Sequence, residues 1–388
     1  MGRLKSRTAA IFRRVPRLKE PIRTSRWIEK LILCESVANA LALAMEPTIA
    51  ARGPTADRAG AAMSAIGLLG LVAAILTSAL TWSGAAWPQG GNWPRSITIG
   101  TASPGGVYDA YGEALARILR RALQIEVTPQ VTQGGAQNVV LMEKKEALLG
   151  FVTTALALQG WNGTDWARGT RYRSMRVIFP MYDTAFHFAV LKRLAIKSLD
   201  DFSGLRIGVG PRAGMAGTYV PEIFNLLGIS AVIRFGAFEQ MASQMTGGKL
   251  DGVAIAAGFP IPALAELDAK QQVDFVQPSS EQSSRILNKF PEISPSMIPA
   301  GTYRSLAHNY HTVGVYNFAI AHEELPDEFI YKLVKAVFDN HEELMKSQPW
   351  ARETIPANID RNTMVPLHPG AVRYYREIGV PIPVQQTN

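Results

Sequence analysis

The chain has 388 residues, of which 47% are hydrophobic and 19% charged, so it is long enough for more than one globular unit with a full core. Of its net charge of +8, residues 1–58 carry +7, since they hold 12 of the 40 Lys and Arg and 5 of the 32 Asp and Glu, so that 28 basic and 27 acidic residues remain. A nucleic-acid partner is therefore not expected, because no basic stripe with interleaved aromatic residues is left after residue 58.

The N-terminal region carries the pattern of an export signal. Residues 1–58 form a basic leader, which a mis-assigned start codon or a disordered extension would explain. Residues 59–86 are uncharged and apolar and end on small residues, so we expect a signal peptide cleaved near Ala85 or Ala86. An N-terminal membrane anchor is the alternative, because the apolar run is about the roughly 20 residues that a bilayer core requires.

After a spacer rich in Gly and Pro, short β-branched runs alternate with helical patterns, which predicts an α/β fold with an open sheet. Expected strands cover residues 97–99, 126–132, 150–153, 175–181, 205–209, 232–235 and 252–256. Over residues 313–320 the chain is expected to return from the second lobe to the first. Expected helices cover residues 109–122, 136–144, 219–227 and 326–346, with a helical turn over 198–202.

The order of these elements predicts two lobes. Residues 95–190 and 316–380 are expected to form the first lobe, and residues 191–315 the second. Glycine-bearing loops at strand ends would then face a shared cleft, which is where a ligand binds between domains. Hinge closure is the expected motion.

The most informative segment is residues 97–108, where a short strand turns through Ser-Pro-Gly-Gly directly into a helix. Backbone amides at such a helix N-terminus attract a small anionic ligand. Ser103 and Tyr108 could donate hydrogen bonds to a carboxylate. Plain turn chemistry is the alternative interpretation for this loop.

Two further loops are candidate ligand contacts. Gln133 and Asn138 flank a glycine pair at a second predicted helix N-terminus, where Asn138 could instead be a structural amide. In the loop over 210–217, which also holds Gly214, the Arg212 guanidinium could bind a carboxylate through two hydrogen bonds or could simply be exposed to solvent.

The sequence lacks the motifs of the common catalytic and cofactor sites. The single cysteine, Cys34, lies in the leader, and there is no H-x-x-x-H, calcium loop or G-x-S-x-G elbow, while the dinucleotide fingerprint is incomplete. We therefore expect no metal, no cofactor and no enzymatic activity. The alternative is an exported enzyme acting on a small acid, with Glu239 or His187 as its base.

Nine segments, taken in order, resemble the TAXI family of extracytoplasmic solute receptors that serve TRAP transporters. Their co-linearity from about residue 97 to residue 379 makes the resemblance specific. The segments are residues 99–108, 134–138, 150–152, 196–206, 247–251, 257–260, 298–303, 366–371 and 374–379.

The resemblance implies a type II periplasmic-binding-protein fold, a Venus-flytrap clamp with a two-crossing hinge. Such a receptor is periplasmic, performs no catalysis, and delivers an organic anion or amino-acid-like solute to the membrane permease subunits of a TRAP transporter. A membrane-tethered ligand sensor is a further alternative. The loop over 211–217 departs from the family pattern by losing hydroxyl donors and gaining Met215.

The resemblance also implies which residues contact the solute. From the first lobe these are Ser103, Gly106, Tyr108, Gly134, Gly135, Thr153, Thr154 and Tyr182. From the second lobe they are Phe259 and Pro260.

Overall fold

The computed structural model describes residues 93–270, 273–362 and 365–382. The predicted leader and the apolar segment over 59–86 lie outside these residues. By its contacts the chain divides after Trp87, and the described residues all belong to the second unit, which begins at Pro88. Within the described ranges, no helix is both long and apolar enough to cross a membrane.

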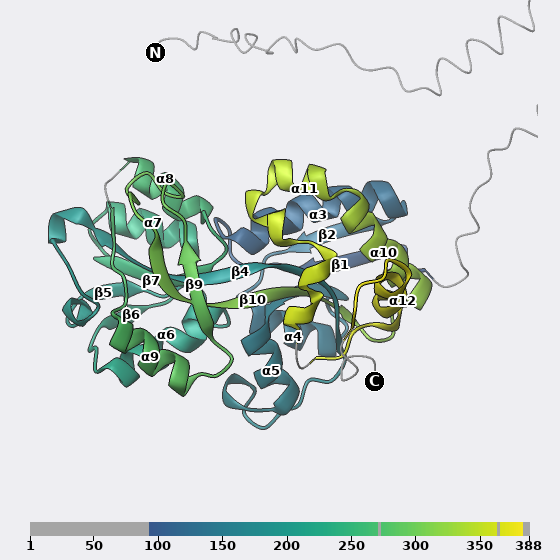
Figure 1. The fold of residues 1–388 in the computed structure, drawn as a ribbon, viewed down its shortest axis with the longest axis horizontal. Coiled ribbons are helices and arrows are strands. Elements are labelled where there is room, and N and C mark those ends of the chain that lie inside the picture. The colour runs from purple at the N-terminus through teal and green to yellow at the C-terminus, as the bar shows by residue number, and fades with distance from the viewer. Residues whose placement is uncertain (1–92, 271–272, 363–364, 383–388) are drawn as a thin grey trace, which may run out of the picture. The chain divides into compact units, whose positions relative to one another are not determined.

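The described residues form one sheet in the order β2-β1-β3-β10-β4-β7-β5-β6, with β8 paired to β4 and β9 paired to β10 (Figure 1). Both parallel and antiparallel pairs occur, since β1 is parallel to β2 and β3 whereas β10 is antiparallel to β3 and β4. The strands are β1 (Ser96–Gly100), β2 (Glu126–Gln130), β3 (Leu149–Thr153), β4 (Met175–Leu191), β5 (Arg206–Gly208), β6 (Val232–Arg234), β7 (Gly252–Ala257), β8 (Val273–Phe275), β9 (Ser294–Ile298) and β10 (Tyr310–His322).

Helices connect the strands and pack against them, which makes the fold α/β as predicted. They are α3 (Val107–Leu123), α4 (Gly135–Glu143), α5 (Thr154–Asn162), α6 (Met215–Leu227), α7 (Phe238–Thr246), α8 (Pro262–Lys270), α9 (Ser280–Lys289), α10 (Asp327–Asp339), α11 (His341–Ser347) and α12 (Pro369–Glu377).

Two long strands join two sets of elements. We call β1, β2 and β3 with α3, α4 and α5 the β1 group, and β5, β6 and β7 with α6, α7 and α8 the β5 group. Strand β10 pairs with β9 over Tyr310–Gly314 and with β3 over Asn317–Ala321. Strand β4 pairs with β10 along most of its length and with β7 over Ala185–Val190. The two groups are therefore connected through continuous backbone (Figure 1).

Strand β4 is buried almost throughout, as expected of a strand with elements packed on both faces. Phe179, Phe186 and Phe188 are fully buried and belong to the larger of two apolar cores. The second core lies around Met241 and Met245 of α7 and includes residues of β7 and α8. The larger core extends into both groups, since it also includes Ile207 of β5 and Val220 and Ile223 of α6.

Most predicted elements are present, with differences at three places. The strand predicted over 175–181 continues to Leu191, and Pro180, which cannot donate to the ladder, lies where the pairing with β10 is irregular. The helix predicted over 326–346 is interrupted at Asn340, between α10 and α11. Helices α5, α7, α8, α9 and α12 and strands β8 and β9 were not predicted, because they are short and their apolar period does not stand out.

Gly370 gives a test of how α12 packs on α10. An added Cβ would lie 2.2 Å from the Asp327 carbonyl oxygen and 2.9 Å from the Tyr331 backbone nitrogen, neither of which is a movable side chain. We expect Gly370→Ala to lower the free energy of unfolding by about 2 kcal/mol or more, through overpacking. Urea denaturation measures this loss. Gly247→Ala is the matched control, since its Cβ would meet nothing closer than 3.4 Å, and an equal effect of both substitutions would contradict the packing argument.

Candidate functional site

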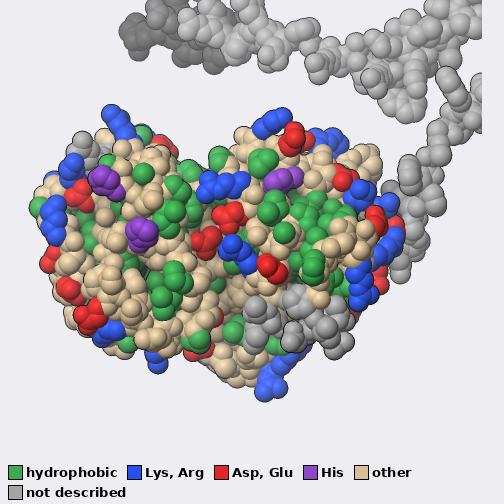
Figure 2. Space-filling view, viewed as in Figure 1, with side chains coloured by type: hydrophobic (Ala, Val, Ile, Leu, Met, Phe, Trp, Pro, Cys, Tyr) green, Lys and Arg blue, Asp and Glu red, His purple; other side chains and the backbone are tan. Residues whose placement is uncertain are grey.

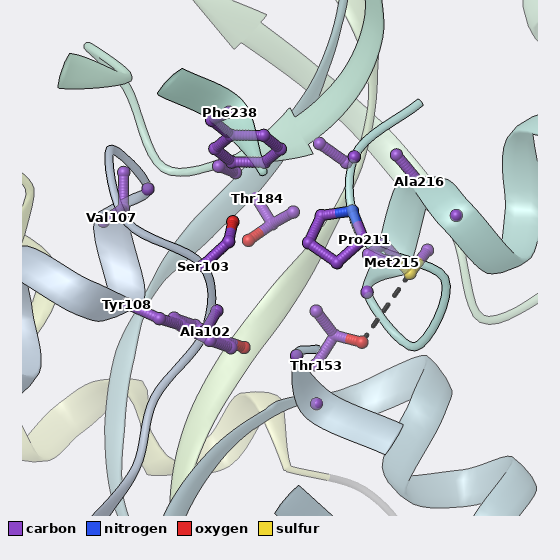
Figure 3. A pocket seen from close by; sticks show the side chains of 18 of the residues that line it. Ala102, Ser103, Val107, Tyr108, Thr153, Thr184, Pro211, Met215, Ala216 and Phe238 are labelled. Atoms are coloured by element: carbon purple, nitrogen blue, oxygen red, sulfur yellow. Dashed lines mark hydrogen bonds between the residues drawn. The ribbon is translucent and has the colours of Figure 1, made fainter. Parts of the chain in front are cut away.

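A cavity lies where the β1 group, the β5 group and the crossing strands meet (Figure 3). It contains about 540 Å³ of space that no atom fills, the outer part of which is open solvent. The β1 group contributes residues 102, 103, 106–108, 134, 135, 153 and 156, the β5 group 209–211, 214–217, 238 and 256–258, and the crossing strands 182, 184 and 317.

Four helices begin at this cavity. The residues that precede their first turns all line it, namely Gly106 for α3, Gly134 for α4, Thr153 for α5 and Gly214 for α6. No described side chain caps the first turn of α3, α4 or α6. Since the first backbone N–H groups of a helix lack partners within the helix and carry partial positive charge, these ends together favour an anionic group.

Two buried hydroxyl groups at the cavity have no hydrogen-bond partner among the described residues. They are the Ser103 Oγ and the Tyr182 phenolic oxygen, on side chains that are 5% and 1% exposed. Burial, and to a smaller extent Tyr108 and Tyr111, raises the pKa of Tyr182 well above 10, so its hydroxyl stays protonated and able to donate. A buried hydroxyl without a partner destabilises a protein, so both groups are suited to a bound solute.

The other polar side chains of the cavity are already engaged. The Tyr108 hydroxyl donates to Asn317 Oδ1 at 2.6 Å, and Asn317 Nδ2 donates to the Tyr182 carbonyl oxygen and to Thr184 Oγ1. The Thr153 hydroxyl contacts the Met215 sulfur at 3.6 Å and accepts a bond from the first turn of α5. In Figure 3 the Ser103 and Thr184 hydroxyls point into the space bordered by Phe238, Pro211 and Met215.

The described residues that line the cavity include no Asp, Glu, Lys, Arg or His. Most are Gly, Ala and larger apolar residues, so the walls suit an apolar body. Any negative charge on a solute would be met by backbone amides and hydroxyls rather than by a cationic side chain. In the described ranges no cluster of three or more His, Cys, Asp or Glu could hold a metal ion.

The two groups touch on both sides of the cavity. On one side the Ala136 backbone N–H donates to the Ala213 carbonyl at 3.0 Å, and a Cβ on Gly134 would come within 2.8 Å of the Gly214 Cα. On the other side the Ala263 N–H donates to the Gly105 carbonyl at 3.2 Å. Figure 2 shows a hollow in the surface along the boundary between the two groups, beside α8 and α11.

Two carboxylates lie near the contact between Gly105 and α8. Asp109 is in the first turn of α3, and Glu239 is in the first turn of α7. The pKa of Asp109 is raised, first by burial and then by Glu113 and Glu239. One carboxylate thus belongs to the β1 group and the other to the β5 group, and neither residue lines the cavity.

Eight of the sequence-predicted site residues lie together in the lining. These are Ser103, Gly106, Tyr108, Gly134, Gly135, Thr153, Tyr182 and Gly214. The structure thus places the loop after β1, the turn before α4, the end of β3 and the start of α6 around one space.

Six other predicted residues lie outside the lining, for different reasons. Asn138 is buried and its Nδ2 donates to the carbonyls of Thr101 and Phe151, so it ties loops together as a structural amide. Thr154 donates to the Tyr316 carbonyl at 3.1 Å. Gln133 is exposed, and its backbone N–H donates to the Gln137 side chain.

The remaining three belong to the β5 group. Arg212 is exposed, and its guanidinium lies 3.9 Å from the centre of the Phe235 ring in a cation–π contact. It does not line the cavity in this structure. Phe259 and Pro260 follow the lining residues 256–258 directly along the chain without lining the cavity themselves.

Sequence reasoning missed three lining residues that shape the site. Thr184 follows Tyr182 by two positions, and the period of a strand would have placed both on one face of β4. Asn317 is the one amide in the apolar run over 313–320, and this pattern could have predicted a buried, hydrogen-bonded side chain there. Phe238 carried no such signal, because its helix was not predicted.

The structure resembles solved structures of binding proteins, and one family matches most of the chain. The NMT1-like family matches residues 99–379. Periplasmic binding protein BugD has a TM-score of 0.50 and 12% identity, over 74% of this chain and 99% of that chain. An ancestral arginine-binding protein bound to arginine has a TM-score of 0.43 and 13% identity, over 67% and 99%.

A third structure is the alkanesulfonate-binding protein SsuA from Xanthomonas axonopodis pv. citri bound to MOPS, with a TM-score of 0.39 and 13% identity, over 75% of this chain and 81% of that chain. At these identities the likeness concerns the fold alone. The chain has the type II periplasmic-binding-protein fold, as the sequence predicted.

His187 gives a test of pH dependence. Its ring nitrogens contact the Ala185 carbonyl and the Tyr303 hydroxyl, both at 2.9 Å, and burial lowers its pKa to about 3. Below pH 6.5 the unfolded chain binds a proton at this residue and the folded chain does not, so the free energy of unfolding should fall as pH decreases. Between pH 7 and pH 5 we expect His187→Gln to remove up to about 2 kcal/mol of this decrease, measured by urea denaturation.

His308→Gln, at an exposed histidine, is the control and should preserve the decrease. Other titrating groups, such as Asp183, whose pKa burial raises to about 6, contribute equally to the wild type and the variants. If His187→Gln shows the wild-type pH dependence, the residue is not a buried neutral histidine.

A hydrogen bond across the two groups gives a test of closure. The Tyr219 hydroxyl of α6 accepts a bond from Gln159 Nε2 of α5 at 2.7 Å and donates to Glu292. We expect Tyr219→Phe to weaken the binding of any solute about fivefold, because about 1 kcal/mol of the closed state is lost. Isothermal titration calorimetry measures the change.

Tyr375→Phe is the matched control, since its hydroxyl donates to Ile178 far from the contact between the groups. It should lower stability and leave affinity unchanged. Equal affinities for wild type and Tyr219→Phe would show that this bond does not contribute to closure.

Proposed function

Because the chain belongs to the NMT1-like family, we propose that it is an extracytoplasmic solute receptor of the TAXI type. It binds a small organic anion or amino-acid-like solute and delivers it unchanged to the membrane permease subunits of a TRAP transporter. The co-linear resemblance over residues 97–379 supports this assignment within the family, and the type II fold is compatible with it.

One observation carries the proposed binding role. Two residues that line the cavity at which four helices begin, Ser103 and Tyr182, carry buried hydroxyls that have no partner among the described residues. Such an arrangement offers hydrogen-bond donors and partial positive charge to a carboxylate or a related group. Between the two solute classes, the lining favours an organic anion, because it holds no carboxylate that could pair with an ammonium group.

We propose that residues 95–190 and 316–380 form one lobe and residues 191–315 the other, with the hinge in the crossing strands. The contacts on both sides of the cavity support a clamp that encloses its solute, as in hinge closure. Opening would separate the β1 group from the β5 group while β4 and β10 bend. Solute contacts would then be shared by Ser103, Gly106, Tyr108, Gly134, Gly135, Thr153, Tyr182 and Gly214.

The proposed role involves no chemical step. The Ser103 hydroxyl has no hydrogen-bond partner within the described ranges, and both ring nitrogens of His187 are engaged in the core. The proposed location is the periplasm, for which the apolar segment over 59–86 would be the export signal.

The test combines a solute screen with two substitutions. A thermal-shift screen of amino acids, dicarboxylates, keto acids and aromatic acids should identify a solute that raises the melting temperature, since binding to the native state alone stabilises it. Ser103→Ala and Tyr182→Phe should each raise Kd for it about tenfold or more, by removing a charge-assisted hydrogen bond. Neither should destabilise the free protein, because each removes a buried hydroxyl that has no partner.

Tyr108→Phe is the contrast, since it breaks the bond to Asn317 and should lower the free energy of unfolding by about 1 kcal/mol. Unchanged affinity in both Ser103→Ala and Tyr182→Phe would remove these hydroxyls from the site. Consumption of the solute during incubation with the protein would overturn the receptor role in favour of an exported enzyme.

A further inference from the structure

A second, smaller cavity lies inside the β5 group. It contains about 230 Å³ of space that no atom fills, between α7, α8 and β7, and the outer part of this space is open solvent. Its lining is entirely apolar and includes Met241, Met245, Val253, Ile255 and Leu264, all of them at most 3% exposed.

Phe238 lines both cavities. It is the first residue of α7, and glycines stand beside its ring on two sides. A Cβ on Gly106 would come within 3.2 Å of the ring and one on Gly210 within 2.9 Å, so the ring occupies space that only glycine leaves free. One aromatic side chain therefore forms the wall shared by the solute cavity and the empty space behind it.

The chemistry of the two cavities limits what could extend from one into the other. Neither lining contains a charged side chain, and beyond Phe238 there is no polar side chain at all. Polar atoms of a solute would have no partner there, whereas an alkyl or aryl chain would replace empty space with contacts. Met241 and Met245 are flexible side chains that can adapt to such a chain.

We propose that Phe238 is a movable wall that sets the length of the solute, and that the space behind it is a subsite for an apolar tail. The solute is then an organic acid with an anionic head at the helix N-termini and a hydrocarbon tail directed at Phe238. When the ring turns aside, the tail enters the second cavity. This inference rests on the proposed function, because it assumes that the larger cavity holds the head of the solute.

The experiment uses straight-chain carboxylates from acetate to octanoate as probes, with affinities measured by calorimetry on the full-length protein. Wild-type affinity should rise by up to about fourfold per added methylene until the tail reaches Phe238. Phe238→Ala should move the preference to longer chains and strengthen octanoate binding about tenfold relative to acetate binding. Phe238→Leu, which keeps an apolar side chain of intermediate size, should give a smaller shift in the same direction.

The matched control is a substitution that fills the second cavity with a larger apolar side chain. Ala242 lines the second cavity on α7 and is only half-buried, so Ala242→Leu can fill the subsite from the side away from the head group. Added to Phe238→Ala, it should abolish the gain for octanoate. If Phe238→Ala fails to fold, Phe238→Leu with and without Ala242→Leu provides the same comparison.

The outcomes separate the two proposals. If the wild type binds none of these acids and no acid in the thermal-shift screen, the organic-anion function fails. If acids bind but the substitutions at Phe238 leave the preference for chain length unchanged, the tail subsite is overturned and the proposed function stands. A gain for octanoate that survives Ala242→Leu would also overturn the subsite, since the tail would then lie elsewhere.

Discussion

The pairing of two long strands is the constraint on which the rest of the structure depends. Strands β4 and β10 run antiparallel to each other, and each contributes residues to both sides of the molecule. Because the backbone is continuous through both strands, the β1 and β5 groups are held so that helices from each begin at one space. Tyr182, Thr184 and Asn317 lie on these strands and form the floor of the cavity at the place where bending would occur.

Close backbone approach is what makes the cavity small and lets backbone groups reach a solute. Gly134, with φ at 108°, lies so near Gly214 that any side chain there would separate the two groups. The same absence of side chains brings the backbone at the starts of α4 and α6 to the cavity wall, where the Ala136 N–H donates to the Ala213 carbonyl. Under the proposed role, amides and hydroxyls would bind the solute without a cationic side chain, so the geometry of closure would set the affinity, because hydrogen bonds weaken steeply with distance and angle.

How far the site could be predicted depended on whether its residues are close in sequence. The loop from Ser103 to Tyr108 and the turn at Gly134 and Gly135 were predicted because a strand, a glycine turn and a helix follow one another directly. Asn138 fits the same pattern and yet serves as a buried structural amide, a distinction that depends on the carbonyls of Thr101 and Phe151 in other segments. Phe238 reaches the cavity only through the packing of α7.

The sequence by itself determined the α/β class, most strands and the glycine-bearing loops, because these follow from local periodicity and turn chemistry. Tertiary structure alone decided which loops meet, that Arg212 stacks on Phe235, and that the Ser103 and Tyr182 hydroxyls have no partner in the part of the chain that the structure describes. The physical reason is that burial and hydrogen-bond satisfaction are properties of neighbours far apart in the chain, which no local pattern encodes.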